Sequence, residues 1–374
     1  MRILHVTPRM DPGGAERIVL QLAADASRMG HRVWVASQAG AWVGRLGEVG
    51  ARHLPLPLGR RSPASVLASA AGLRRALGRL RPDLVHAHNP RAAAAVRLAG
   101  RAGDHASLCT VHGLAPSDYP AAARVLRRCR CRVVACSPAV AAALEAAGYR
   151  AGPLEVVTNG ARLAPAPPER VAALRQALGL GPGPVVVGVG RLVDQKDWPT
   201  LIEAAQGLDG ASVLVAGEGR LRPRLEALAA RAGGRVRFVG HVDDVAALLG
   251  LADCVVSASA WEGLPLALLE ALSLGRPVVA TAVDGVAGLL PPGAALLVGR
   301  SDRPATARAL AGAIRQVLDD PALAARLSAG AAEASQAWSP EAMLAGYRRA
   351  YARARGRPQP LVATDWAWPS EGRR

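Results

Sequence analysis

The strongest constraint on this chain is an alternation of strand-like and helix-like segments that begins at its N-terminus. Short apolar runs occupy residues 3–6, 32–37, 83–88, 106–112, 132–137 and 154–159. Helical patterns separate them, as in residues 15–29, where apolar residues share one face and Gly30 follows as a stop. This alternation predicts a parallel sheet with helices on both faces, since parallel strands need crossover connections.

A second alternating series follows a proline-rich segment, with apolar runs at 185–190, 212–217, 236–240, 254–259, 277–281 and 295–299. A chain of 374 residues suits two domains. We therefore predict an α/β protein with two doubly wound domains: residues 1–160, a linker at 161–170, residues 171–338, a helix over 339–356, and a loosely ordered tail at 357–374. Ligands of such sheets bind outside the carboxyl ends of the strands, so the cleft between the domains is the expected site.

The positive charge of the chain is concentrated in its first half. Residues 1–160 hold 22 arginines against 9 acidic residues, a difference of +13, whereas residues 161–374 hold 24 basic and 20 acidic residues, a difference of +4. Residues 59–82 alone carry six arginines beside an Ala/Leu face. This pattern suits an anionic membrane surface, although a solvated arginine-rich helix explains it equally well. Nucleic acid is not an expected partner, because the basic stretches lack interleaved aromatics.

Several classes of protein are disfavoured. No apolar run of eighteen residues predicts a membrane span, and the first residues lack the features of a signal peptide, so we expect a cytoplasmic location, with peripheral attachment to the inner face of the membrane as an option. The sequence has no D-x-D and no His/Cys/Asp cluster with metal-ligand spacing. We therefore expect neither a protein-bound metal nor another cofactor.

The only lysine of the chain, Lys196, follows the strand-like run that ends at Gly190, and Arg191 lies between them. Two cations at a strand-to-helix turn can hold a diphosphate: the guanidinium offers a planar fork and the ammonium a compact point charge. The alternative is a stray surface lysine that pairs with Asp194 or Asp197.

A second candidate site lies in SASAWEGLPLALLEALSLGRPVVAT, residues 257–281. Glu262 follows a strand, and the next three residues are expected to open a helix that reaches about Leu274. Free N–H groups at the start of a helix can receive a phosphate. Glu262 and Glu270 are eight positions apart and are candidates for hydroxyl binding; the alternative is that both are merely solvated acids.

In the first half, Gly13 and Gly14 of DPGGAER separate the first strand from its helix, which lets a backbone approach an anion closely. The pattern is neither G-x-G-x-x-G nor a P-loop. His86, His88 and His112 end two further strands. We expect such histidines to face the cleft, with a place in the core as the alternative for any one of them.

Taken together, these segments resemble the retaining glycosyltransferases of family 4, which have the GT-B fold of two Rossmann-like domains. The resemblance covers nearly the whole chain and rests on PGGAER, GRLVDQKD, VAGEGRLR, VRFVGHVDD and, above all, WEGLPLALLEALSLGRPVVAT. The chain departs from the family in one place. An aromatic residue usually precedes the glycine after the first glutamate, whereas here Trp261 precedes Glu262 and Gly263 follows it directly.

The resemblance implies roles for individual residues. Arg191 and Lys196 would clamp the donor diphosphate, Glu262 would contact the donor sugar, and Glu270 would hold the ribose. His112 would lie near the reacting sugar. Close contacts to the nucleotide-sugar are implied for Gly13, Gly14, Val239, Gly240, Gly263, Leu264, Pro265 and Leu266, and acceptor-side positions for Glu16, His88 and Asn89. The last helix would return to the first domain.

The implied activity is metal-independent transfer of a sugar, with retention, from a nucleotide-sugar to a hydroxyl of a saccharide or lipid-linked acceptor, in the synthesis of bacterial surface polysaccharide, lipopolysaccharide or glycolipid. A sugar-nucleotide epimerase of the same fold would share the diphosphate site but need no acceptor. A non-catalytic nucleotide-sugar-binding protein is expected to have lost the cationic clamp or the glutamates. A pyridoxal-phosphate enzyme built on Lys196 has no further supporting pattern.

Overall fold

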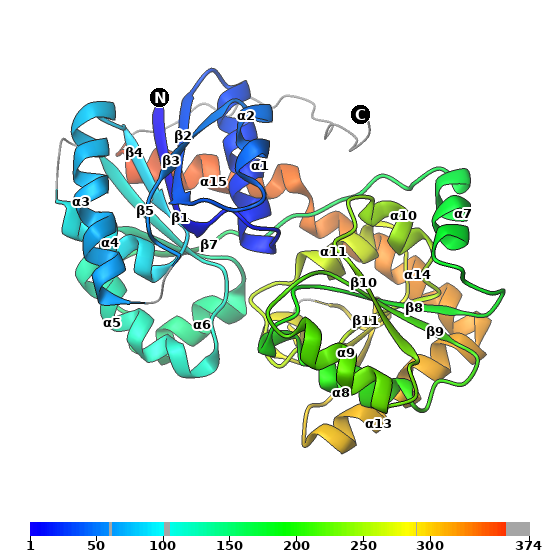
Figure 1. Cartoon of the computed structure of the whole chain (residues 1–374). Coiled ribbons are helices and arrows are strands. Elements are labelled where there is room, and N and C mark those ends of the chain that lie inside the picture. Colours follow the sequence, from blue (N-terminus) through cyan, green and yellow to red (C-terminus); the bar gives the residue numbers. More distant parts are fainter. Residues whose placement is uncertain (60–61, 101–104, 289, 357–374) are drawn as a thin grey trace. The chain divides into compact units, whose positions relative to one another are not determined.

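The computed structural model describes residues 1–59, 62–100, 105–288 and 290–356, and these form two compact units (Figure 1). Unit 1 comprises residues 1–159 together with 341–356. Unit 2 comprises residues 160–340. Each unit has its own parallel sheet.

Unit 1 is built on a seven-stranded parallel sheet in the order β3-β2-β1-β4-β5-β6-β7. Its strands are β1 (Arg2–Arg9), β2 (Arg32–Gln38), β3 (Ala51–Pro55), β4 (Leu84–Ala87), β5 (Ala106–Val111), β6 (Arg132–Ala135) and β7 (Leu154–Val156). Its helices are α1 (Gly14–Arg28), α2 (Val43–Glu48), α3 (Pro63–Leu80), α4 (Pro90–Ala99), η1 (Pro116–Asp118), α5 (Tyr119–Cys129), α6 (Pro138–Ala146) and most of α15 (Pro340–Ala354).

Unit 2 has a six-stranded parallel sheet in the order β10-β9-β8-β11-β12-β13. Its strands are β8 (Val185–Val189), β9 (Ser212–Ala216), β10 (Val236–Gly240), β11 (Cys254–Ser257), β12 (Val278–Thr281) and β13 (Leu296–Val298). Its helices are α7 (Pro168–Ala177), η2 (Asp194–Lys196), α8 (Trp198–Ala205), α9 (Arg222–Arg231), α10 (Val245–Gly250), α11 (Leu266–Ser273), α12 (Asp284–Ala287), α13 (Arg303–Asp319), α14 (Pro321–Ser335) and η3 (Gln336–Trp338).

The predicted fold class is confirmed: all twelve expected strands are present in two parallel sheets, within one to three residues of the expected ends. The sequence analysis missed β3 (Ala51–Pro55), because this edge strand is half exposed and mixes polar with apolar residues instead of forming an apolar run. It also placed residues 168–170 in an unstructured linker. These three residues form the first turn of α7, in which proline suits the first helical position.

The helices that connect the strands of unit 1 have defined ends and pack along the sheet. Helix α1 ends at Arg28, and Gly30 adopts the left-handed conformation (φ 74°) expected of a stop glycine. Helices α3 to α6 pack side by side along the sheet, as Figure 1 shows for α3, α4 and α5. The apolar stripe of each helix covers the sheet, so the loops after the strands remain available for ligands.

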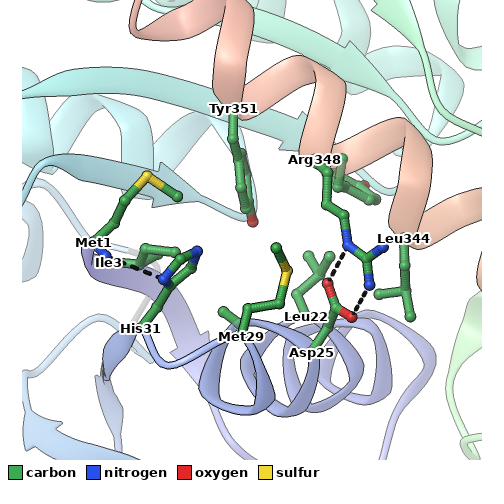
Figure 2. Close-up of a pocket in the computed structure, with 11 residues that line it drawn as sticks. Met1, Ile3, Leu22, Asp25, Met29, His31, Leu344, Arg348 and Tyr351 are labelled. Atoms are coloured by element: carbon green, nitrogen blue, oxygen red, sulfur yellow. Dashed lines mark hydrogen bonds and ion pairs between the residues drawn. The ribbon is translucent and has the colours of Figure 1, made fainter. Parts of the chain in front are cut away.

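The last helix, α15, packs on unit 1 beside α1 (Figure 2). Arg348 holds the Asp25 carboxylate through two nitrogens, at 2.9 Å and 2.5 Å. Tyr347, directly before Arg348, and Tyr351, three residues after it, are buried, and their hydroxyls bond Thr110 and His86 of the sheet. The four-residue spacing of the tyrosines along the helix therefore reflects packing on this sheet.

The core of unit 2 is formed by β-branched strand residues and by helices α8 and α13, with Trp198 buried among them. In the part of the chain that the structure describes, no helix combines the length and hydrophobicity needed to cross a bilayer. The expected tail at 357–374 lies outside the described residues.

Candidate functional site

The clearest polar cluster of unit 2 lies where β8 and β11, two neighbouring strands, end. Lys196, the last residue of η2, donates from Nζ to Glu262 Oε1 at 2.5 Å. The Lys196 side chain is 16% exposed and that of Glu262 is 5% exposed. The alternative of a surface lysine paired with Asp194 or Asp197 is therefore wrong, since those aspartates pair instead with Arg220 and Arg300.

Two further donors hold the Glu262 carboxylate. Ser259 Oγ donates to Oε1 at 2.7 Å, and Gln195 Nε2 donates to Oε2 at 3.3 Å and to the Trp261 carbonyl at 3.1 Å. The carboxylate therefore has two hydrogen bonds besides the one from Lys196.

The turn that carries Lys196 is fixed by hydrogen bonds of the two residues that follow the lysine, Asp197 and Trp198. The residue after it, Asp197, is left-handed (φ 44°) and accepts from Thr200 Oγ1 at 2.9 Å and from an Arg300 nitrogen at 2.8 Å. The buried Trp198 donates to the Arg191 carbonyl at 2.9 Å. Such a conformation is unfavourable for a non-glycine residue and persists only where its surroundings support it.

Gly190 makes room for the lysine. A Cβ at this position would lie 3.0 Å from Lys196 Cε and 3.3 Å from its Cδ. The aliphatic stem therefore crosses the end of β8 over a residue without a side chain. Arg191, the other predicted cation, has an exposed side chain next to this position.

Helix α11 begins next to the same cluster. It starts at Leu266, with Pro265 as its extended N-cap, and ends at Ser273, so it is shorter than expected and Pro265 is not in its first turn. Gly263, Leu264 and Leu266 are buried. Glu270 is also buried, at 3% exposed, so the alternative of an idle solvated acid is wrong for this residue.

The other predicted nucleotide contacts lie further along the same edge of the sheet. Gly240, the last residue of β10, is left-handed (φ 76°), and its Cβ would meet the Glu218–Arg222 ion pair. Val239 before it is half-buried. Both residues lie at the carboxyl end of β10, which is separated from β8 by β9. They are therefore at the same edge of the sheet as Lys196 but two strands away from it.

In unit 1, the predicted residues follow the ends of three adjacent strands, β1, β4 and β5. Gly13 is extended (φ −179°), a backbone that any residue adopts, and Gly14 opens α1. Asn89 caps α4, because its Oδ1 accepts from the Ala92 N–H at 2.7 Å. Glu16 lies in the first turn of α1, where a carboxylate suits the helix dipole.

His86 and His88 are buried, so the alternative of a place in the core applies to both side chains. His86 is 0% and His88 3% exposed. His86 bonds Tyr351 Oη at 2.9 Å and Thr110 Oγ1 at 2.8 Å, while His88 bonds His112 at 3.2 Å. The period-two alternation of β4 and β5 directs these side chains to the sheet face that α15 covers. His112, half-buried, is the member nearest the strand end.

Burial keeps these histidines neutral. It lowers the pKa of His5 to about 3 and the pKa of His112 to about 4, and it lowers the pKa values of His86 and His88 well below their usual range. The neighbouring imidazoles act in the same direction on His86 and His88. Sequence analysis missed His5, for which the only signal is its place on the inner face of β1.

The basic segment 59–82 is amphipathic for a structural reason. Leu73 and Leu77 of α3 are 0% exposed and face the core of unit 1, whereas Leu67 is 61% exposed. Arg74, Arg75 and Arg79 are also exposed. The exposed side of α3 therefore carries the arginines, while the buried leucines are taken up by the core. Two of the six arginines of this segment, at 60 and 61, lie outside the described residues.

Comparison with known proteins places both units in one class. Residues 12–164 match the family model described as Glycosyltransferase Family 4, and residues 183–320 match the one described as Glycosyl transferases group 1. The crystal structure of Anabaena Alr3699/HepE in complex with UDP-glucose superposes with a TM-score of 0.80 at 24% identity, over 94% of this chain and 98% of that one.

Curated relatives match over shorter stretches. The lipopolysaccharide core biosynthesis glycosyltransferase LpsD of Rhizobium meliloti is 34% identical over 204 residues, 54% of this chain and 57% of the relative. The alpha-D-kanosaminyltransferase of Streptomyces kanamyceticus is 34% identical over 172 residues, 44% of each chain. The chain thus spans about half the length of these relatives. The two family models each match less than half of the chain but together cover both units, so the chain is similar to family 4 glycosyltransferases in each unit and has the GT-B fold.

Proposed function

We propose that the protein is a retaining glycosyltransferase that moves a sugar from a nucleoside-diphosphate sugar to a hydroxyl of a saccharide or lipid-linked acceptor, without a protein-bound metal. One observation carries the proposal: the single lysine of the chain is placed, nearly buried, on a carboxylate at the ends of β8 and β11. The acceptor class follows from the relatives, one of which is named for lipopolysaccharide core synthesis and one for transfer of kanosamine.

In this proposal, the donor diphosphate binds between Arg191 and Lys196. Lys196 leaves Glu262 for a phosphate oxygen, and Glu262, still held by Ser259 and Gln195, turns its free lone pairs to a sugar hydroxyl. The bond from the anomeric carbon to the phosphate oxygen then breaks, and the two cations neutralise the charge that develops on the leaving diphosphate. Two charge-assisted hydrogen bonds of about 1.5–3 kcal/mol each would contribute roughly 10²- to 10⁴-fold in rate.

The acceptor hydroxyl attacks the anomeric carbon from the side of the leaving group. Its proton passes to the departing diphosphate, so configuration is retained without an enzyme nucleophile. His112 bonds a hydroxyl of the reacting sugar, Glu270 the ribose, and the stretch at Val239 and Gly240 the base. Under this assignment, the cations do the work that a divalent ion does in other transferases.

The protein is proposed to act in the cytoplasm, in the synthesis of a cell-surface glycan, with the arginine face of α3 resting on anionic lipid. The support is the excess of arginine in the first half of the chain and the exposure of Arg74, Arg75 and Arg79.

The deciding experiment incubates the protein with UDP-, GDP- and ADP-sugars, with and without candidate acceptors, in the presence of EDTA. Formation of an α-configured product from an α-linked donor only when acceptor is present supports the proposal. Formation of an epimer without acceptor supports the epimerase alternative, and tight donor binding with no turnover supports a binding protein. Strict dependence on added magnesium or manganese would contradict the metal-independent mechanism.

A further inference from the structure

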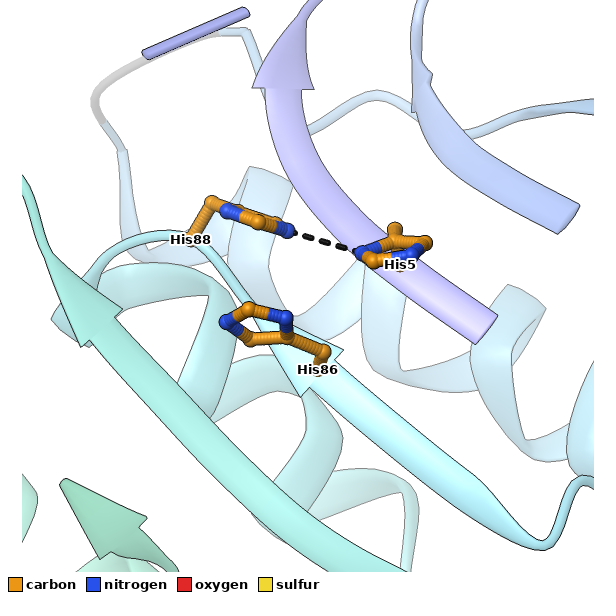
Figure 3. Close-up of side chains that lie close together, drawn as sticks. All are labelled: His5, His86 and His88. Atoms are coloured by element: carbon orange, nitrogen blue, oxygen red, sulfur yellow. Dashed lines mark hydrogen bonds between the residues drawn. The ribbon is translucent and has the colours of Figure 1, made fainter. Parts of the chain in front are cut away.

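Three histidines of unit 1 form a continuous hydrogen-bonded chain. His5 Nδ1 lies 3.0 Å from His88 Nε2, and His88 Nδ1 lies 3.2 Å from His112 Nε2. Figure 3 shows the rings of His5, from β1, and His88, which directly follows the adjacent strand β4, directed at each other. His112 follows β5, the next strand of the sheet. We call these three residues the imidazole chain.

Hydrogen-bond counting couples the tautomers of the three rings. A neutral imidazole offers one donor and one acceptor. Because both His88 nitrogens are engaged, His88 must donate to one neighbour and accept from the other. If it donates to His112, then His5 donates to His88 and the free proton of the chain lies on His112 Nδ1. In the reverse order that proton lies on His5 Nε2.

The surroundings of the two ends favour the first order. His5 is 0% exposed, and no described residue bonds its Nε2. A proton there would be an orphaned buried donor, which is rarer and more costly in proteins than an acceptor lacking one partner. His112 Nδ1 is itself buried and likewise has no partner among the described residues, but His112 as a residue is half-buried and follows the carboxyl end of a strand, where a bound ligand can supply the missing acceptor.

A metal ion is the competing explanation for the cluster. Nitrogens of His5, His86 and His88 lie within 4.8 Å of one another. A metal would need a lone pair from each ring directed at one point. Both nitrogens of His86 are engaged instead, with Tyr351 and Thr110, and both nitrogens of His88 are engaged with the other two histidines. The contacts therefore favour hydrogen bonding over metal binding.

We propose that His5 and His88 are positioning residues that hold His112 in its Nδ1–H tautomer, so that His112 presents a hydrogen-bond donor to an oxygen of the reacting sugar. The inference rests on the proposed function for the sugar, but the state of His112 is a property of unit 1 alone. His5 contacts no substrate in this scheme. His5 acts on His112 through His88, which bonds both of them.

The first test uses the wild-type protein labelled with ¹⁵N at histidine, without donor or acceptor. Scalar couplings across the two N–H···N contacts and a protonated Nδ1 on His112 are expected. A His112 protonated at Nε2 would overturn the proposal, as would one equivalent of tightly bound metal that is lost on His86→Leu substitution. The spectra need no turnover, so their failure would leave the transferase proposal untouched, and absence of transfer would leave the tautomer result standing.

The second test uses matched variants. His5→Leu removes the far end of the chain, whereas His5→Asn places an amide at the Nδ1 position and can keep the bond to His88. His86→Leu is the control, since His86 is also buried and its ring centroid lies 4.0 Å from that of His88, but the residue is outside the imidazole chain. We expect His5→Leu to release the His112 tautomer and to lower kcat about tenfold at unchanged donor KM.

His5→Asn should restore both the tautomer and kcat, and His86→Leu should leave the tautomer unchanged. If His86→Leu shifted the His112 spectrum as much as His5→Leu, the effect would be one of packing and the proposal would fail. If either leucine variant does not fold, the couplings in the wild-type protein and the His5→Asn variant still test the tautomer of His112.

Discussion

Lys196 and Glu262, 66 residues apart in the chain, meet as a nearly buried ion pair at the ends of β8 and β11, with Nζ 2.5 Å from Oε1. Breaking a buried pair by removing one partner is costly, because it leaves a charge without compensation. Here the carboxylate accepts from two other donors, whereas the described contacts of Lys196 Nζ include no acceptor besides Glu262, so we expect the lysine to be the partner that changes its contact. This relation underlies the first prediction.

Substitution of Lys196 should strongly reduce the rate of sugar transfer and have only a small effect on the stability of the fold. Lys196→Ala is expected to lower kcat by about 10²- to 10³-fold, the usual effect of losing one group that stabilises transition-state charge. Lys196→Arg should lower it at least about tenfold, since a planar guanidinium does not replace a compact ammonium at a site built for a point charge. Steady-state kinetics checks this, with the exposed Arg224→Ala as control. Near-normal turnover of the arginine variant would refute the point-charge argument.

A single methyl group at Gly190 should disturb the lysine without touching any polar group. In Gly190→Ala the new Cβ would lie 3.0 Å from Lys196 Cε, so the side chain must move. We expect weaker binding of the nucleotide-sugar, by about tenfold, with little loss of stability. Isothermal titration measures it. Gly181→Ala is the control, because a Cβ there has open space; equal affinities for both variants would show that the lysine position does not depend on Gly190.

The Asp25–Arg348 pair should hold α15 on unit 1. Its side chains are only 10% and 23% exposed, and two short hydrogen bonds join them. Arg348→Ala is therefore expected to reduce the free energy of unfolding by about 1–3 kcal/mol. Urea unfolding tests this against the adjacent, exposed Arg349→Ala. If the two variants lost the same stability, the ion pair would have no role in attaching the helix.

The buried histidines predict a stability that falls with acid. Their folded-state pKa values lie below the ordinary 6.5, at about 3 for His5 and about 4 for His112. Between these values and 6.5 the unfolded chain binds more protons than the folded one, so stability is complete above pH 6.5 and is lost as the pH falls towards 4. Each such histidine contributes a slope of about 1.4 kcal/mol per pH unit at most.

Urea unfolding between pH 5.5 and 7.5, a window above most carboxylate titration, measures this slope. His5→Asn should reduce this slope by the contribution of one histidine, about 1.4 kcal/mol per pH unit at most, because one proton fewer is taken up on unfolding. An identical slope in wild type and variant would mean that His5 does not change its protonation on unfolding.

The arginine face of α3 predicts selective binding to anionic vesicles. Replacing Arg74, Arg75 and Arg79 with glutamine should weaken flotation with anionic liposomes, since each basic residue near such a surface is worth about 1 kcal/mol. The control removes three exposed arginines of unit 2 instead, at Arg224, Arg231 and Arg326, for the same change in net charge. Equal binding of the wild type to neutral and anionic vesicles would remove the support for membrane attachment.

The sequence by itself determined the two parallel sheets, the positions of twelve of their strands and the similarity to family 4 glycosyltransferases. Apolar runs at strand spacing and the WEGLPLALLEALSLGRPVVAT block are local signals, because backbone periodicity and helix starts depend on neighbouring residues. It also singled out Lys196, Glu262 and His112. It missed β3 at the sheet edge, where solvent on one side removes the need for an apolar run.

Only the tertiary structure decided which polar groups meet. The partner of Lys196 is Glu262 and not a nearby aspartate, and the partner of Asp25 is Arg348 at the far end of the chain. His86 and His88 turned out to be buried on the face that α15 covers, in contact with His5 and two tyrosines that no local pattern connects to them. Such pairings depend on the order of the strands in the sheet and on where a distant helix packs. A local sequence pattern contains no information on either.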